Sequence, residues 1–89
     1  MNERNKIINL AEISGEILRA ALPNDVQFIL THHIHNYISY LYNELTHKEP
    51  AYKTEMYENE LENAIEISKK YNLKWTDKLI ELNHYEVQS

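Results

Sequence analysis

The chain contains one glycine (Gly15), two prolines (Pro23 and Pro50) and no cysteine among its 89 residues. Glycine and proline are the residues that most often interrupt helices and strands or form tight turns. A chain with so few of them is expected to have few connections between long regular elements. The absence of cysteine also excludes a disulfide framework and thiol chemistry.

Apolar residues recur three and four positions apart along most of the chain, which is the period of an amphipathic helix. We therefore predict an all-α fold in a single domain, an up-down bundle of three main helices and a short C-terminal fourth. The predicted helices cover about residues 3–22, 25–47, 50–71 and 76–85. The predicted core consists of aliphatic residues from all four helices: Leu10, Ile17, Leu30, Ile34, Leu41, Leu61, Ile65 and Leu79.

Local signals indicate where these helices begin and end. Asn24 and Gln27 have the spacing of a capping box at the start of the second helix. Asn72 is expected to stop the third helix, and Thr76 to cap the fourth. Each of these residues predicts a boundary between helices.

Gly15 lies in the middle of the first predicted helix, where it costs about 1 kcal/mol relative to alanine. Together with Ala11 and Ser14 it forms a patch of small side chains. The close approach of another helix is the use that we expect for this patch. A tolerated glycine without a role is the alternative.

The chain carries 9 basic and 14 acidic residues, a net charge of −5. This balance argues against a nucleic-acid binder, because phosphate contacts are made by Lys and Arg. No apolar stretch is long enough for a membrane span, and the first 20 residues do not resemble a signal peptide. We expect a cytoplasmic protein. Because a domain of this size buries little surface, we also expect a homodimer or a higher oligomer.

Catalytic and metal motifs are weak in this sequence. The chain has no glycine-rich phosphate loop and no nucleophile elbow, so we expect that it is not an enzyme. His32 and His35 share one helix face, but the sequence identifies no third metal ligand. Two Glu-x-x-His pairs match the pattern of di-metal helical bundles, which stays open as a third function. These pairs are Glu44 with His47 and Glu81 with His84. No metal or cofactor is predicted.

The first function that we predict is a small acidic interaction module of the phage or bacterial type. It would act as an inhibitor or adaptor by binding a basic surface of another protein, since acidic faces steer basic partners. Tyrosine is enriched at interfaces, and the second predicted helix is rich in it. The residues predicted to contact the partner are Tyr37, Tyr40, Tyr42, His33, Glu44, Glu55, Glu58 and Glu62.

The alternative is an oligomer that binds a small anionic ligand such as a nucleotide. Tyrosine rings would stack on a base, and histidines would hydrogen-bond to it. The densest basic cluster of the chain lies at and after the end of the third predicted helix and consists of Lys69, Lys70, Lys74 and Lys78. The residues predicted for this site are His32, His35, Lys69, Lys70 and Lys74.

Overall fold

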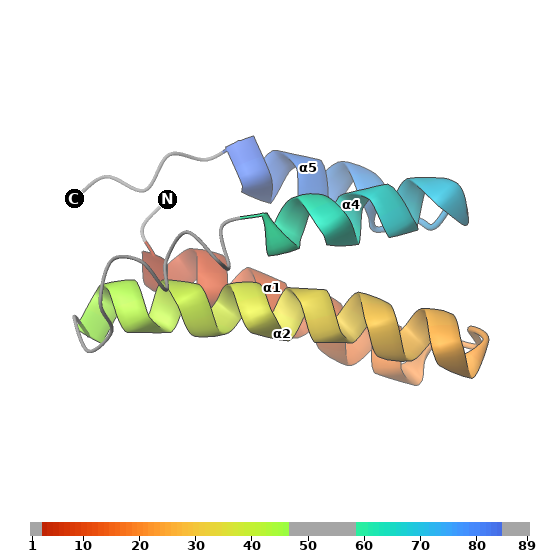
Figure 1. The fold of residues 1–89 in the computed structure, drawn as a ribbon, viewed down its shortest axis with the longest axis horizontal. Coiled ribbons are helices and arrows are strands. Elements are labelled where there is room, and N and C mark those ends of the chain that lie inside the picture. The colour runs from red at the N-terminus through yellow and green to blue at the C-terminus, as the bar shows by residue number, and fades with distance from the viewer. Residues whose placement is uncertain (1–2, 47–58, 85–89) are drawn as a thin grey trace.

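The computed structural model describes residues 3–46 and 59–84, apart from the side chains of residues 3, 44 and 45. These two segments contain four helices and no strand, so the predicted all-α class is confirmed (Figure 1). The helices are α1 (Glu3–Arg19), α2 (Asn24–Thr46), α4 (Glu60–Lys70) and α5 (Thr76–His84).

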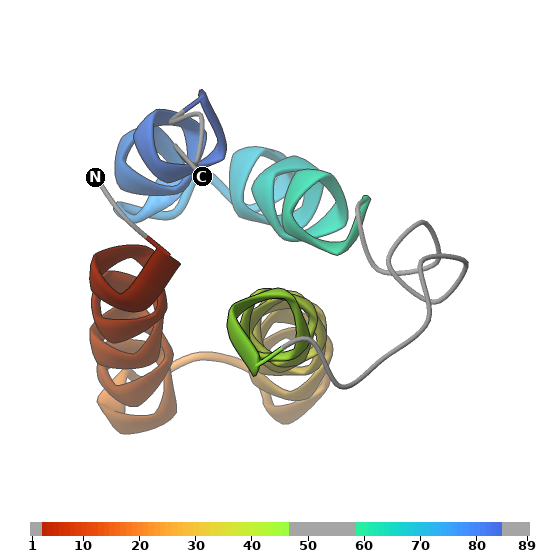
Figure 2. The same cartoon turned by 90° about the vertical axis from the view of Figure 1, so that its left-hand side faces the viewer.

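Successive helices run in opposite directions, and each contacts the next: α1 with α2, α2 with α4, and α4 with α5 (Figure 1). Figure 2 shows the four helices end-on, with α4 above α2 and α5 above α1. The long helices α1 and α2 therefore form one layer, and the shorter α4 and α5 form the other. Helix α4 begins at Glu60 after the N-cap residue Asn59. The first part of the third predicted helix, residues 50–58, lies outside the described residues.

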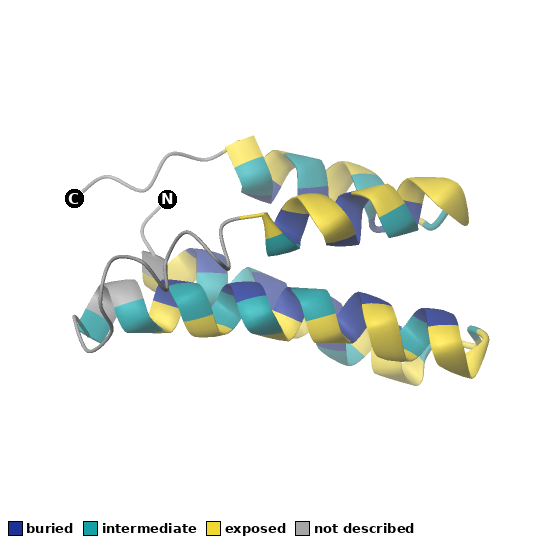
Figure 3. Ribbon diagram, in the orientation of Figure 1, coloured by how far each residue is buried: buried dark blue, intermediate teal, exposed yellow. Residues whose placement is uncertain are grey.

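The core lies between the two layers, where Figure 3 shows the buried stripes of the helices facing one another. All eight predicted core residues are buried. The same cluster also contains Ile13, Tyr37, Ala64, Trp75 and Leu82. Full burial of one Leu or Ile side chain contributes about 1.5–3 kcal/mol. The three- and four-residue period thus gives each helix one apolar side, and these sides meet in a single core.

The α1–α2 connection is closed by a side chain in a way that differs from the prediction. Helix α1 ends at Arg19, three residues before its predicted end. The Gln27 Nε2 group on α2 donates to the carbonyl oxygens of Ile17 and Leu18, at 3.0 and 3.1 Å. Carbonyl groups at the C-terminal end of a helix lack intrahelical donors, and the Gln27 amide acts as the donor here. Gln27 therefore caps the C-terminus of α1 rather than completing a capping box at α2.

The α4–α5 turn contains Asn72 in the left-handed region, with φ of 53°. This conformation ends α4, as the sequence predicts. The Thr76 hydroxyl donates to the Leu73 carbonyl oxygen at 2.9 Å and lies 2.6 Å from the Ser68 hydroxyl oxygen. Because the Thr76 proton points to Leu73, the fully buried Ser68 hydroxyl donates to Thr76. Thr76 thus closes the turn instead of capping α5.

Among the helices that the structure describes, none is both long enough and apolar enough to cross a lipid bilayer.

Candidate functional site

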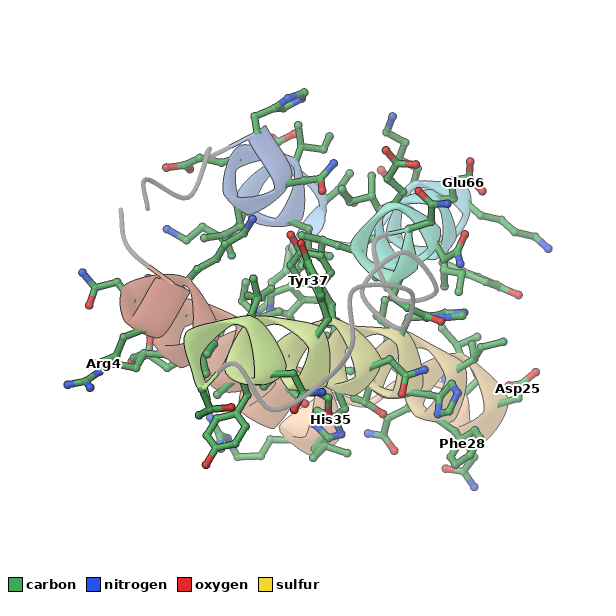
Figure 4. All side chains as sticks on the ribbon, turned by 60° about the vertical axis from the view of Figure 1, so that its left-hand side comes forward. Arg4, Asp25, Phe28, His35, Tyr37 and Glu66 are labelled. Atoms are coloured by element: carbon green, nitrogen blue, oxygen red, sulfur yellow. The ribbon has the colours of Figure 1, made fainter. Side chains whose placement is uncertain are left out.

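Tyr37, a predicted partner contact, lies in the core between the two layers (Figure 4). Its hydroxyl accepts a hydrogen bond from Lys6 Nζ on α1 at 2.9 Å, and both side chains are buried. The Lys6 ammonium also lies 5.0 Å from the centre of the Tyr37 ring. Burial lowers the pKa of Lys6, since desolvation disfavours the charged form. In this structure Tyr37 is therefore a core residue that joins α1 to α2, not a surface residue.

His33, also predicted to contact a partner, is partly buried between α2 and α4. Its Nδ1 atom is in hydrogen-bonding contact with the Glu60 carboxylate at the start of α4, and this contact is an ion pair when the imidazole is protonated. His33 borders a cleft of about 260 Å³, whose other lining residues are Asn63, Glu66, Ile67 and Lys70. The contact between His33 and Glu60 ties the two layers together at this seam.

The other predicted partner contacts are scattered. The Tyr40 ring is partly buried and lies 5.4 Å from the Tyr37 ring, centre to centre. Tyr42 is 52% exposed on α2. Glu62 is exposed on α4, on the other layer. The side chain of Glu44, together with Glu55 and Glu58, lies outside the described residues.

The residues of the predicted anion site are distributed over separate surfaces. His32 and His35 are exposed on α2, where His35 Nε2 lies 2.7 Å from the Ser14 hydroxyl of α1. Each of the three lysines lines a different cleft: Lys70 beside His33, Lys69 between α4 and α5, and Lys74 beside Trp75. The structure therefore does not bring these lysines together around one cavity.

Metal ligation was the third function kept open. Within the described segments, no group of three or more His, Asp or Glu side chains is arranged to hold a metal ion. Glu81 and His84 are both exposed at the end of α5. His47, the histidine of the other Glu-x-x-His pair, lies outside these segments.

The side of the α1–α2 layer that faces away from α4 and α5 exposes large apolar side chains. The hydrogen bond between Ser14 and His35 marks where the two helices meet on this side. Phe28 and Tyr42 stand seven residues before and after His35, so the three side chains follow one line along α2. Leu18 lies one turn after Ser14 on α1. We call this surface the outer α1–α2 face; it comprises Ala11, Leu18, Phe28, His35 and Tyr42.

Exposure on the outer α1–α2 face is high for residues of this kind. Phe28 is 72% exposed, Leu18 55% and Tyr42 52%. Figure 4 shows Phe28 and His35 on the far side of α2 from the α4–α5 layer, with Tyr37 on the near side. The Phe28 ring stacks on His32, with an interplanar angle of 12° and 6.0 Å between centres. The face is thus an apolar surface with histidine interspersed.

A second feature is a cleft of about 310 Å³ between α1 and α5. Its lining residues are Asn9, Glu12, Ile13, Glu16, Lys74, Trp75 and Lys78. Trp75 is only 7% exposed, and its Nε1 atom is buried with no hydrogen-bond acceptor in the described segments. Burying such a donor without an acceptor costs about 1–3 kcal/mol. We call this feature the α1–α5 cleft.

The two features are missed by the sequence prediction for different reasons. The predicted partner surface joins the histidines and tyrosines of α2, whereas the seven-residue spacing of Phe28, His35 and Tyr42 separates them from the buried Tyr37. The α1–α5 cleft needs residues far apart in the chain, and no spacing signal predicts it.

Neither a protein-family model, nor a curated protein sequence, nor a solved structure matches this chain.

Proposed function

We propose that the protein is an interaction module that binds another protein through the outer α1–α2 face. The observation that carries the proposal is the exposure of Phe28, Leu18 and Tyr42, each more than half accessible, on one side of the helix pair. Phe28 and Tyr42 are 14 residues apart on α2, so the exposed apolar side chains extend along the face, as is typical of interaction surfaces. Aromatic residues are also enriched where such surfaces are buried by a partner.

The charge of the chain indicates the chemistry of the partner. The net charge is −5, and Asp25 is exposed at the start of α2, three residues before Phe28. Complementary charge accelerates association and selects against partners of like charge. The partner that fits is a protein with an apolar pocket inside a basic surface. The protein would then act as an inhibitor or adaptor by covering that surface.

Self-association, also expected from the sequence, would use the same apolar area. A second copy carries the same negative charge, which opposes pairing at low ionic strength. A basic partner does not meet this repulsion. We therefore propose a different protein as the main occupant of the face, and a homodimer as the state of the free chain at high concentration or high salt.

The test compares three immobilised proteins: the wild type, the double variant Leu18→Ser with Phe28→Ser, and the control Tyr71→Ser. Tyr71 is an exposed aromatic residue at the C-cap of α4, outside the face. The proposal predicts that the wild type and the control retain the same basic protein from a host extract. The double variant should bind it at least about tenfold more weakly, with its helix content unchanged. Equal retention by all three proteins would exclude the face.

Light scattering on the same three proteins tests self-association. If the free chain pairs through the face, the dimer of the wild type and of the Tyr71→Ser control should be lost in the double variant. A dimer that survives the double substitution would place self-association elsewhere on the chain.

A further inference from the structure

We propose that the α1–α5 cleft binds a small zwitterion, a molecule that carries an ammonium and a carboxylate group on an apolar frame. The two sides of the cleft come from opposite ends of the chain, because α5 packs above α1 (Figure 2). This proposal is independent of the outer α1–α2 face, which lies on another side of α1.

The charges of the cleft are separated by helix. Glu12 and Glu16 stand on the α1 side, whereas Lys74 and Lys78 come from the α4–α5 turn and from α5. In the described segments none of these four side chains takes part in an ion pair; the ion pair that is present joins His33 and Glu60. The cleft therefore has an anionic wall and a cationic wall that no ion pair joins in the described segments.

The separation of the anionic wall from the cationic wall determines which ligand charge the cleft favours. A simple anion such as a phosphate would be attracted by Lys74 and Lys78 but repelled by the carboxylates opposite. A simple cation would be attracted by the carboxylates but repelled by Lys74 and Lys78. Arg19, another positive charge, lies beside the same carboxylates on α1. A zwitterion places one charge on each wall, so both interactions are favourable. The charge pattern thus favours a zwitterion over a nucleotide or a metal ion.

The lining between the two walls is apolar. Ile13 and Trp75 are both buried there. The Lys74 ammonium lies 5.2 Å from the centre of the Trp75 ring, which favours its position at this wall. The apolar lining in turn favours a ligand with a hydrocarbon frame.

The size of the cleft limits the ligand further. Its volume of about 310 Å³ is at the lower end of the range of about 300–1,000 Å³ for small-molecule pockets. A single amino acid or an ω-amino acid fits this volume. A dinucleotide or a long peptide does not.

The experiment uses the full chain and the fluorescence of Trp75, the only tryptophan in the sequence. L-leucine and 6-aminohexanoate serve as zwitterionic probes. Leucinamide and N-acetyl-leucine serve as matched probes that keep only the positive or only the negative charge. We expect a saturable change in Trp75 emission with at least one zwitterion, and at least about tenfold weaker binding of both single-charge probes.

Two outcomes would overturn the proposal. One is the absence of a saturable change with either zwitterion up to about 10 mM, a concentration at which even weak sites fill. The other is binding of leucinamide or N-acetyl-leucine as tight as that of the zwitterions, because one wall would then suffice.

Variants locate the site. Glu16→Gln and Lys78→Gln should each weaken zwitterion binding by about threefold or more, since each removes one charged wall contact at an exposed position. Glu62→Gln and Lys69→Gln are the matched controls, because they line the separate cleft between α4 and α5. The controls should bind as the wild type does. Unchanged binding by Glu16→Gln and Lys78→Gln, or an equal loss in the controls, would contradict the assignment.

The double variant Leu18→Ser with Phe28→Ser should still bind the zwitterion, so a failure of one proposal is distinguishable from a failure of the other.

Discussion

Lys6 on α1 donates a hydrogen bond to the Tyr37 hydroxyl on α2 across 2.9 Å, and both side chains are buried. No carboxylate in the described segments forms an ion pair with this ammonium group. A buried charge that is only hydrogen-bonded has lost much of its hydration. The contact therefore joins the two long helices, but it costs folding free energy when Lys6 is charged.

The stability of the wild type should consequently rise in mildly alkaline solution relative to that of Lys6→Met. Burial lowers the pKa of Lys6 below its ordinary value of 10.5, so the unfolded chain holds this proton more tightly than the folded chain. Stability therefore increases as the pH rises through the folded pKa towards 10.5. Denaturant unfolding of both proteins between pH 7 and about pH 10 checks this, because their difference cancels the other titrating groups. Parallel pH profiles would contradict the prediction.

Replacing Gly15 by alanine should stabilise the isolated protein by about 0.5–1 kcal/mol, because glycine is a poor residue inside a helix. The atoms nearest to an added Cβ belong to the Arg19 guanidinium, from 3.3 Å. This exposed, flexible group can move aside. Thermal unfolding measures the effect, and a loss of stability would contradict it. The nearest atoms come from α1 itself, so the expected approach of another helix to Gly15 does not occur within the described chain.

Asn72 should tolerate glycine but not alanine. Its φ of 53° is favourable for glycine, tolerated by asparagine, and unfavourable by about 1–2 kcal/mol for other residues such as alanine. Asn72→Ala should therefore lower the free energy of unfolding by about that amount, whereas Asn72→Gly should change it by less than about 0.5 kcal/mol. Denaturant unfolding of the two variants provides a matched comparison. Similar effects of both substitutions would mean that the left-handed conformation does not limit this turn.

His33 and Glu60 should be energetically coupled. A double-mutant cycle with His33→Gln and Glu60→Gln should give a coupling of about 0.5–1 kcal/mol, since the pair is partly solvated and weakened by water. The coupling should decrease with added salt. His32→Gln with Glu60→Gln is the control, because His32 faces outward next to His33. Additive effects of the His33 and Glu60 substitutions would show that the contact contributes nothing to the α2–α4 seam.

The helical period was sufficient to predict the fold class and the eight core residues, because burial of one apolar side per helix dominates the folding of this chain. That Asn72 stops α4, which ends at Lys70, was also predictable, since asparagine is one of the few residues that tolerate the left-handed conformation. The capping of α1 by Gln27 was not predictable, because the Gln27 amide can reach either helix end in a short connection. Spacing alone does not distinguish these two arrangements.

The sites were less predictable than the fold. Tyrosine is compatible with both a core and an interface, and only the packing of Lys6 against Tyr37 decides for the core. Tyr42, five residues later, points to the opposite side and is half exposed. The α1–α5 cleft depends on how α5 returns to α1, which no local pattern specifies. Long-range packing, rather than local helix propensity, determines both the outer α1–α2 face and the α1–α5 cleft.

Site-specific photo-crosslinking shows whether the outer α1–α2 face binds a partner. A photoreactive amino acid is introduced at Phe28 and, in a separate control protein, at Tyr71, which is exposed outside the face. Both proteins are irradiated in a host extract under identical conditions. If the face binds a partner, a crosslinked basic protein is expected from position 28 and none from position 71. No crosslink from position 28, or the same crosslink from both positions, would contradict it.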